Sequence, residues 1–272
     1  MPSFFQLTRR TVLTLGVATS LVLAGIGGAT AQTLEQIQAK GTLTVGTLVD
    51  FPPFGLLDLN GNPDGYDPEL ARMLADRLGV ELEIVPVSGP NRVPYLLSNR
   101  VDLLIAALGI TAERAEQVDF SDPSATVNQV VYAPKDMELS SLEDLSGRSI
   151  GVARGSAQDI TLTSSVPADA TIQRFDDDPT TLQALLSGQV DTIAMSTLLI
   201  ADIGKVANVE AFEIKFPIQT LVHGIAMRKD NPELLDFVNQ FLADAKADGT
   251  LNEVHRKWVG VDFTDVEKPV FE

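Results

Sequence analysis

Short apolar runs alternate along the chain with stretches whose apolar positions recur every three or four residues, as in strands that alternate with helices. The run from Val101 to Leu108 is apolar almost throughout and predicts a strand buried on both faces of a parallel sheet. Further strands are expected at 43–47, 80–84, 149–153 and 171–175. Helices are expected to start at Asp67 and Asp178, which both precede a proline, and to fill most of 232–259. The pattern therefore predicts an α/β chain.

One seven-residue pattern occurs twice. The segment 96–102, LLSNRVD, returns as LLSGQVD at 185–191. Both copies read as a helix end, a tight turn and an entering strand, which favours two related α/β lobes over a chance similarity. In this register Ala107 matches Ser196. Because ligands of open α/β sheets bind off the carboxyl ends of strands, both strand ends are expected to face one crevice.

Two β-rich segments are interpreted as crossings between the lobes. The first is 130–135, which is interrupted by Pro134, and the return crossing is 221–227. The predicted organisation is a lobe formed by 32–132 and 223–272, with a second lobe formed by 133–222.

The first 31 residues have the order of an export signal. Arg9 and Arg10 precede an apolar segment, and small residues end at Ala31, where cleavage is expected. The apolar segment is short and interrupted by glycine and threonine, which argues against a membrane anchor. The sequence around Arg9 and Arg10 also resembles a twin-arginine signal, so the general secretory and twin-arginine routes both stay open.

The composition excludes several classes of function. None of the 272 residues is cysteine, so disulfides, thiolate metal sites and cysteine nucleophiles are ruled out. The formal net charge is −17, and the only charged residues of the signal are Arg9 and Arg10, so its removal makes the charge more negative. An acidic surface disfavours nucleic acid and anionic membranes as partners. No ligand spacing for a metal is found, and neither a metal nor a cofactor is expected.

A candidate anion site follows the strand at 101–108. Gly109 ends the strand, Thr111 offers a helix N-cap, and Arg114 lies in the first helical turn. A cation is unfavourable there because the helix dipole already presents positive charge. Free N–H groups and a guanidinium together suit a carboxylate. The alternative is that Arg114 forms surface ion pairs with acidic neighbours.

Two loops supply further candidates. Gly155 and Ser156 form a turn before an expected helix, so Ser156 could bind the same anion as Arg114 or act as an ordinary N-cap. Near the first strand, Asp50 precedes Phe51-Pro52-Pro53-Phe54, whose paired prolines make the loop rigid. We expect Phe51 to face a ligand and Phe54 to lie in the core.

Taken together, these motifs resemble the bacterial extracellular solute-binding proteins of the polar amino-acid class, the receptors of ABC importers. The matching segments run in the family's order: 46–47, 51–54, 65–67, 101–102, 110–114, 118–121, 224–226 and 257–260. The resemblance implies a type II periplasmic-binding-protein-like fold, with two lobes joined by two crossing strands that close on a ligand. It also implies a periplasmic, monomeric receptor that delivers its ligand to an ABC permease.

The resemblance assigns roles to individual residues. Arg114 corresponds to the clamp on the ligand's α-carboxylate, with backbone N–H groups near Gly109 and Ser156 completing the pocket. Phe51 corresponds to the aromatic that covers the ligand. Ala107 corresponds to a main-chain carbonyl directed at the α-amino group.

Three positions depart from the family pattern. Gly109 stands where a serine or threonine is common, and Leu48 where an acid is common. Ser196 stands where the family has the aspartate that binds the ligand's ammonium. Loss of that bond costs roughly 1.5–3 kcal/mol. Either another acid substitutes, with Asp50 the candidate, or the ligand is a carboxylated solute whose ammonium is blocked or absent.

Two other functions compete with the transport receptor. Cyclohexadienyl or arogenate dehydratases share the fold, but the chain shows no catalytic ordering of serine, histidine and aspartate, and only two histidines, His223 and His255. Structural or solvated roles are expected for both, so an enzyme is not predicted. A ligand sensor for a membrane kinase is the other alternative.

Overall fold

The computed structural model describes residues 33–203 and 209–271, so the expected export signal and its cleavage after Ala31 lie outside the described residues. Within these ranges, eight strands form one mixed sheet in the order β4-β1-β5-β10-β6-β9-β7-β8. Their bounds are β1 (Thr42–Thr47), β4 (Glu81–Pro86), β5 (Leu103–Leu104), β6 (Val118–Pro134), β7 (Ser149–Ala153), β8 (Thr171–Phe175), β9 (Thr192–Ser196) and β10 (Phe212–Arg228). The remaining strands, β2 (Leu56–Leu57) and β3 (Pro63–Asp64), pair with each other. The predicted α/β class with a mainly parallel sheet is confirmed.

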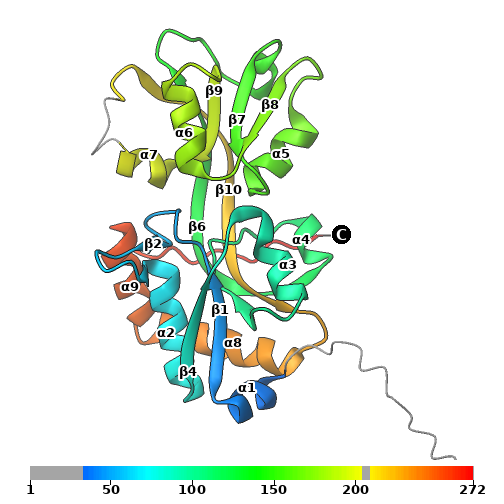
Figure 1. The fold of residues 1–272 in the computed structure, drawn as a ribbon, viewed down its shortest axis with the longest axis vertical. Coiled ribbons are helices and arrows are strands. Elements are labelled where there is room, and N and C mark those ends of the chain that lie inside the picture. Colours follow the sequence, from blue (N-terminus) through cyan, green and yellow to red (C-terminus); the bar gives the residue numbers. More distant parts are fainter. Residues whose placement is uncertain (1–32, 204–208, 272) are drawn as a thin grey trace, which may run out of the picture. The chain divides into compact units, whose positions relative to one another are not determined.

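The long strands β6 and β10 join two groups of elements (Figure 1). They pair antiparallel from Val118↔Arg228 to Pro134↔Phe212. On one side β10 pairs with β5, which continues in parallel to β1 and β4. On the other side β6 pairs with β9, which continues in parallel to β7 and β8. The two-lobed fold is therefore present. β6 begins well before the crossing segment expected at 130–135, while the boundaries assigned to the lobes remain a prediction.

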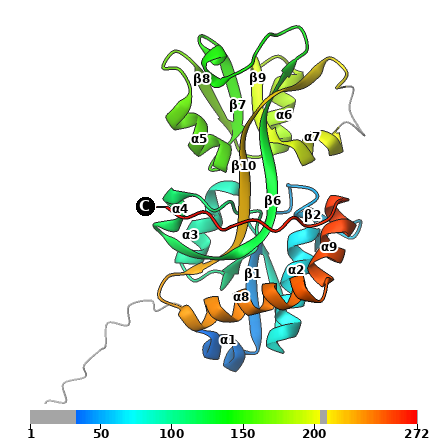
Figure 2. The ribbon, with the colours of Figure 1, turned by 180° about the vertical axis from the view of Figure 1, so that it is seen from behind.

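Helices cover the sheet in both groups (Figure 2). Beside β4, β1 and β5 lie α1 (Leu34–Lys40), α2 (Tyr66–Leu78), α3 (Arg92–Leu97), α4 (Ala112–Ala115), α8 (Pro232–Ala247) and α9 (Thr250–Val259). Beside β9, β7 and β8 lie α5 (Ala157–Ser165), α6 (Asp178–Leu186) and α7 (Thr197–Ile203). Two short 3₁₀ turns, η1 (Gly89–Asn91) and η2 (Leu142–Leu145), complete the elements. In the described part of the chain, no helix has both the length and the apolar character needed to span a bilayer.

The repeated seven-residue pattern has the same local structure in both copies. Asn99 and Gly188 occupy matching positions and both have positive φ, 58° and 72°. Asp102 accepts a hydrogen bond from the Thr44 amide of β1 at 2.9 Å, and Asp191 accepts one from the Ser149 amide of β7 at 2.7 Å. Each copy thus ties an entering strand to the first strand of its own group, which supports the interpretation of two related lobes.

Asp67 was expected at the start of its helix as the cap, but it has a different role in the structure. α2 begins at Tyr66 with Gly65 as its N-cap, and Asp67 is the second helical residue. Its buried carboxylate instead accepts a hydrogen bond from the Ala107 amide at 2.6 Å. Ala107 has a φ of +44°, a conformation that L-residues rarely adopt. Asp67 therefore holds the chain at the end of the β5 segment, where the candidate site lies.

Candidate ligand-binding site

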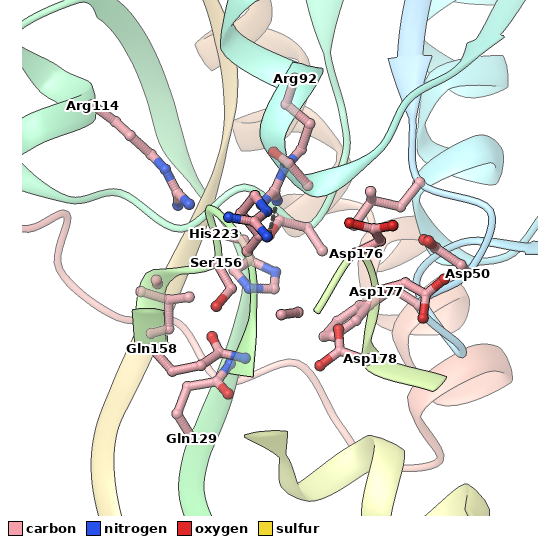
Figure 3. A pocket seen from close by; sticks show the side chains of 18 residues that line it. Asp50, Arg92, Arg114, Gln129, Ser156, Gln158, Asp176, Asp177, Asp178 and His223 are labelled. Atoms are coloured by element: carbon pink, nitrogen blue, oxygen red, sulfur yellow. Dashed lines mark hydrogen bonds between the residues drawn. The ribbon is translucent and has the colours of Figure 1, made fainter. Parts of the chain in front are cut away.

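A small cavity of about 40 Å³ lies where the two groups of elements meet along β6 and β10 (Figure 3). Its wall combines residues from distant parts of the sequence. From the first group come Leu48, Asp50, Phe51, Gly89, Arg92, Ala107 and Arg114; from the second come Ala153, Arg154, Ser156, Ala157, Gln158, Asp176, Asp177 and Asp178; and from β6 and β10 come Gln129, Leu221 and His223. Chain segments that lie far apart in the sequence therefore meet at one site.

Arg114 reaches this cavity from α4. Thr111 caps the helix, with its hydroxyl accepting the Arg114 amide at 3.4 Å. The side chain is 5% exposed and donates to the carbonyl of Gly109 at 2.8 Å and to that of Gly155 at 2.9 Å. Within 33–203 and 209–271 it forms no ion pair, so the surface-pairing alternative is not what the structure shows. Burial, reinforced by Arg92, lowers the pKa of Arg114 to about 9. A buried cation without a counter-charge favours an anionic ligand.

Arg92 is a second buried guanidinium in the wall, and sequence reasoning missed it. It opens α3 and donates to the carbonyls of Gly89, Ala106, Ala107 and Gly155 at 3.2, 3.0, 3.3 and 3.3 Å. Burial lowers its pKa to about 10, against the opposing effect of nearby aspartates. A signal was present in the sequence, because Arg92, like Arg114, is a cation in a first helical turn.

Four aspartates form the acidic part of the wall. Asp50, Asp176, Asp177 and Asp178 lie on the side of Figure 3 opposite Arg114. Burial and then repulsion by Asp50 raise the pKa of Asp178 to about 7. Burial and then repulsion by Asp177 raise the pKa of Asp50. The cavity therefore has a cationic region and an acidic region, as a zwitterionic ligand requires.

The crossing strands contribute neutral polar groups between these regions. His223 of β10 is 3% exposed, and burial, with Arg92 and Arg114 nearby, lowers its pKa to about 3. It is therefore neutral at physiological pH, and its ring packs edge-on against Phe54 at 5.0 Å. Gln129 of β6 and Gln158 of α5 are 2% and 3% exposed. The prediction of a structural or solvated role for His223 covers only part of its position, because the residue also lines the cavity.

Five of the eight residues named from the sequence line the cavity: Asp50, Phe51, Ala107, Arg114 and Ser156. Phe51 stacks on Phe54, whose side chain is fully buried in the core. Ser156 is also the N-cap of α5, accepting the Asp159 amide at 3.1 Å, so it has the capping role as well as a place in the wall.

Gly109, Gly155 and Ser196 are not part of the wall. A Cβ on Gly109 would meet the side chain of Leu221 at 2.4 Å, so Leu221 fills the space that a serine or threonine would need. Gly155 instead presents its carbonyl to both guanidiniums. Ser196 is fully buried, and its hydroxyl accepts the Leu198 amide at 3.1 Å. At the position of the family's aspartate, this chain therefore has a residue whose hydroxyl is engaged by a nearby main-chain amide.

Known proteins resemble this chain over almost its whole length. Residues 43–261 match the model of the bacterial extracellular solute-binding proteins, family 3. The L-cystine-binding protein TcyJ of Escherichia coli is 32% identical over 233 residues, covering 85% of this chain and 87% of TcyJ.

Solved structures show the same fold. The receptor for L-cysteine of Neisseria gonorrhoeae superposes with a TM-score of 0.76 at 34% identity, covering 83% of this chain and 92% of that one. The ancestral amino acid-binding protein AncCDT-1, described as a precursor of cyclohexadienyl dehydratase, superposes with a TM-score of 0.75 at 33% identity, covering 84% and 99%.

Proposed function

Starting from the fact that the chain belongs to family 3 of the bacterial extracellular solute-binding proteins, we propose that it captures a small carboxylated amino-acid-like ligand between its lobes. It is a solute-binding receptor of the ABC amino-acid transport class. The proposal extends to an exported, periplasmic monomer that passes its ligand to a membrane permease. The names of TcyJ and of the Neisseria receptor point to L-cystine and L-cysteine as the first ligands to examine.

The buried guanidinium of Arg114 is the observation that supports this proposal most directly. It lines the cavity, and its donors are directed at two main-chain carbonyls rather than at a carboxylate side chain. A ligand carboxylate would exchange these neutral acceptors for a charged one, and charge-assisted hydrogen bonds are about twice as strong.

The same contacts support closure of the lobes on the ligand. Arg114 and Arg92 belong to the first group of elements, and both donate to Gly155 of the second. The cavity of about 40 Å³ has room for only a few water molecules. An amino acid therefore enters when the lobes part, and its binding shifts the population toward the closed arrangement.

Calorimetry on the purified mature protein tests the proposal. The twenty common amino acids and L-cystine are titrated into the wild-type protein and into Arg114→Ala. We expect at least one tight ligand, and a loss of well over tenfold in its affinity for the variant, because charge-assisted bonds are worth roughly 1.5–3 kcal/mol.

Arg77→Ala is the matched control, since Arg77 is an exposed arginine that pairs with Asp244 at 2.7 Å, away from the cavity. Its affinity should equal that of the wild type. If Arg114→Ala binds as tightly as the wild type while folded, the proposed carboxylate site is refuted.

Two observations bear on the dehydratase alternative. The description of AncCDT-1 connects this fold to cyclohexadienyl dehydratase, and Asp178 is a carboxyl group with a raised pKa in the cavity. Turnover of prephenate or arogenate by the purified protein would support this alternative, whereas binding without turnover supports the receptor.

A further inference from the structure

A free amino acid carries an ammonium group, which requires an acceptor in the cavity wall. Ser196 does not serve, because it lies off the cavity wall and its hydroxyl accepts the amide of Leu198. The Ala107 carbonyl, expected in this role, accepts from Arg92 at 3.3 Å and has a lone pair left, but it carries no charge. A charged partner for the ammonium must therefore be sought among the other groups in the wall.

Gln129 lies directly beside the position of the missing aspartate. It pairs with Ser196 across the antiparallel β6–β9 ladder, and residues directly opposite each other project to the same face of a sheet. Its side chain lines the cavity and is 2% exposed, and its Oε1 accepts no hydrogen bond from the residues that the structure describes. A buried oxygen without a donor costs free energy, so a ligand that brings an N–H group is favoured here.

Asp178 provides a second acceptor, with charge. It is the first residue of α6 and lines the same cavity. The residue is half-buried, but its Oδ1 is enclosed and has no hydrogen-bond partner among the described residues. Asp50, Asp177 and Arg92 are the charged groups that act on it. The donors of Arg92 point to main-chain carbonyls, so Arg92 does not satisfy that oxygen.

We propose that Asp178 and Gln129 together bind the ammonium group of the ligand and thereby replace the aspartate expected at position 196. This inference rests on the proposed function and specifies it further: the ligand is a free amino acid whose amine is neither blocked nor absent. An ammonium has three N–H donors, which fit a carboxylate oxygen and an amide oxygen that lack donors. Asp178, rather than Asp50, is the principal acid because its Oδ1 is enclosed and has no hydrogen-bond partner among the described residues.

Proton release is a consequence of this assignment. Asp178 is largely protonated below its folded pKa of about 7 and must ionise to pair with an ammonium. The affinity for a free amino acid should therefore rise with pH between about 5 and 8. Asp50 and Asp177 oppose this ionisation, and Arg92 favours it.

The test compares free and N-acetylated probes by calorimetry. Each common amino acid and L-cystine is titrated at pH 6.5 and 8, together with the N-acetyl form of each amino acid that binds. We expect acetylation to weaken binding to the wild type at least tenfold. Asp178→Asn and Gln129→Met should each weaken the free ligand at least fivefold while changing the affinity of the acetylated form less than twofold.

Asp136→Asn is the matched control, because Asp136 is exposed, carries the same charge and is not among the residues that line the cavity. Its affinity should stay within twofold of the wild type. Proton release, measured for the wild type in phosphate and in Tris, requires no variant and therefore still tests the proposal if a variant fails to fold.

The outcomes separate this inference from the proposed function. If acetylated probes bind as tightly as free ones, if folded Asp178→Asn binds like the wild type, or if binding releases no proton at pH 6.5, the assignment is overturned while the receptor stands. If neither free nor acetylated probes bind the wild type, the proposed function fails and the assignment fails with it.

Discussion

The packing of Gly109 against Leu221 gives the most quantitative prediction. A Cβ at position 109 would lie 2.4–2.5 Å from three side-chain carbons of Leu221, far inside van der Waals contact. Such overpacking typically costs 1–3 kcal/mol, whereas loss of glycine's freedom in the unfolded chain returns only about 0.4–1 kcal/mol. Gly109→Ala should therefore lower the free energy of unfolding by roughly 1–2 kcal/mol.

Leu221→Ala removes the obstructing atoms and should reverse the sign of this effect. Alone it destabilises the protein, because Leu221 is 6% exposed and packs at the cavity wall. In the Leu221→Ala background, the added methyl group of Gly109→Ala fits into the vacated space and should be neutral or stabilising. The double variant is then more stable than the sum of the single effects by about 1–3 kcal/mol.

Urea unfolding of the four proteins, followed by circular dichroism with unchanged m-values, measures this coupling. Leu59→Ala serves as a control for the leucine truncation, since Leu59 is fully exposed, and it should not couple to position 109. Additive effects of Gly109→Ala and Leu221→Ala would show that the two residues do not compete for the same space. The explanation given for the glycine at this position would then be wrong.

Two further predictions concern stability. Asp102→Ala leaves the buried Thr44 amide unpaired and should cost about 2–3 kcal/mol, whereas Asp191→Ala acts at an exposed site and should cost about 1 kcal/mol; equal losses in urea unfolding would contradict this. For the ligand-free protein, Asp178 has a folded pKa of about 7, above its unfolded value of 3.8. The stability that the protonated Asp178 contributes is therefore fully present below about pH 4 and is lost as the pH rises through about 7. Thermal unfolding of Asp178→Asn should show a weaker decline over that interval, and an identical pH profile would argue against the raised pKa.

The local elements were largely predictable from the sequence. β7 and β8 have exactly the expected bounds, β1 begins one residue early, and Thr111 caps α4. These features depend on neighbouring residues, namely apolar runs, caps and turns. The length of β5 was overestimated. The strand pairs with its neighbours only at Leu103–Leu104, although the whole run 101–108 is buried. Hydrophobicity indicated burial there but not hydrogen bonding.

The cavity wall was only partly predictable, because it depends on long-range register. Whether Gln129 or its neighbour faces the cavity is decided by the pairing of β6 with β9 and β10, and a shift of one residue exchanges the faces. The register shift between His223 and Gly224 is a second feature that the sequence does not reveal, and such irregularities redirect side chains. Ser196 illustrates the limit, because a correct strand prediction did not show that its hydroxyl is bound by the following helix.

In the proposed site, the carbonyl of Gly155 makes ligand capture an exchange rather than a simple addition. Its oxygen accepts from Arg114 at 2.9 Å and from Arg92 at 3.3 Å, so an incoming carboxylate competes with the protein's own main chain for the same donors. The affinity then depends on the difference between a charged acceptor on the ligand and a neutral acceptor on the main chain. Because this competitor is a main-chain oxygen, a side-chain substitution at position 155 does not delete it, whereas a shift of the turn that carries it would change the competition.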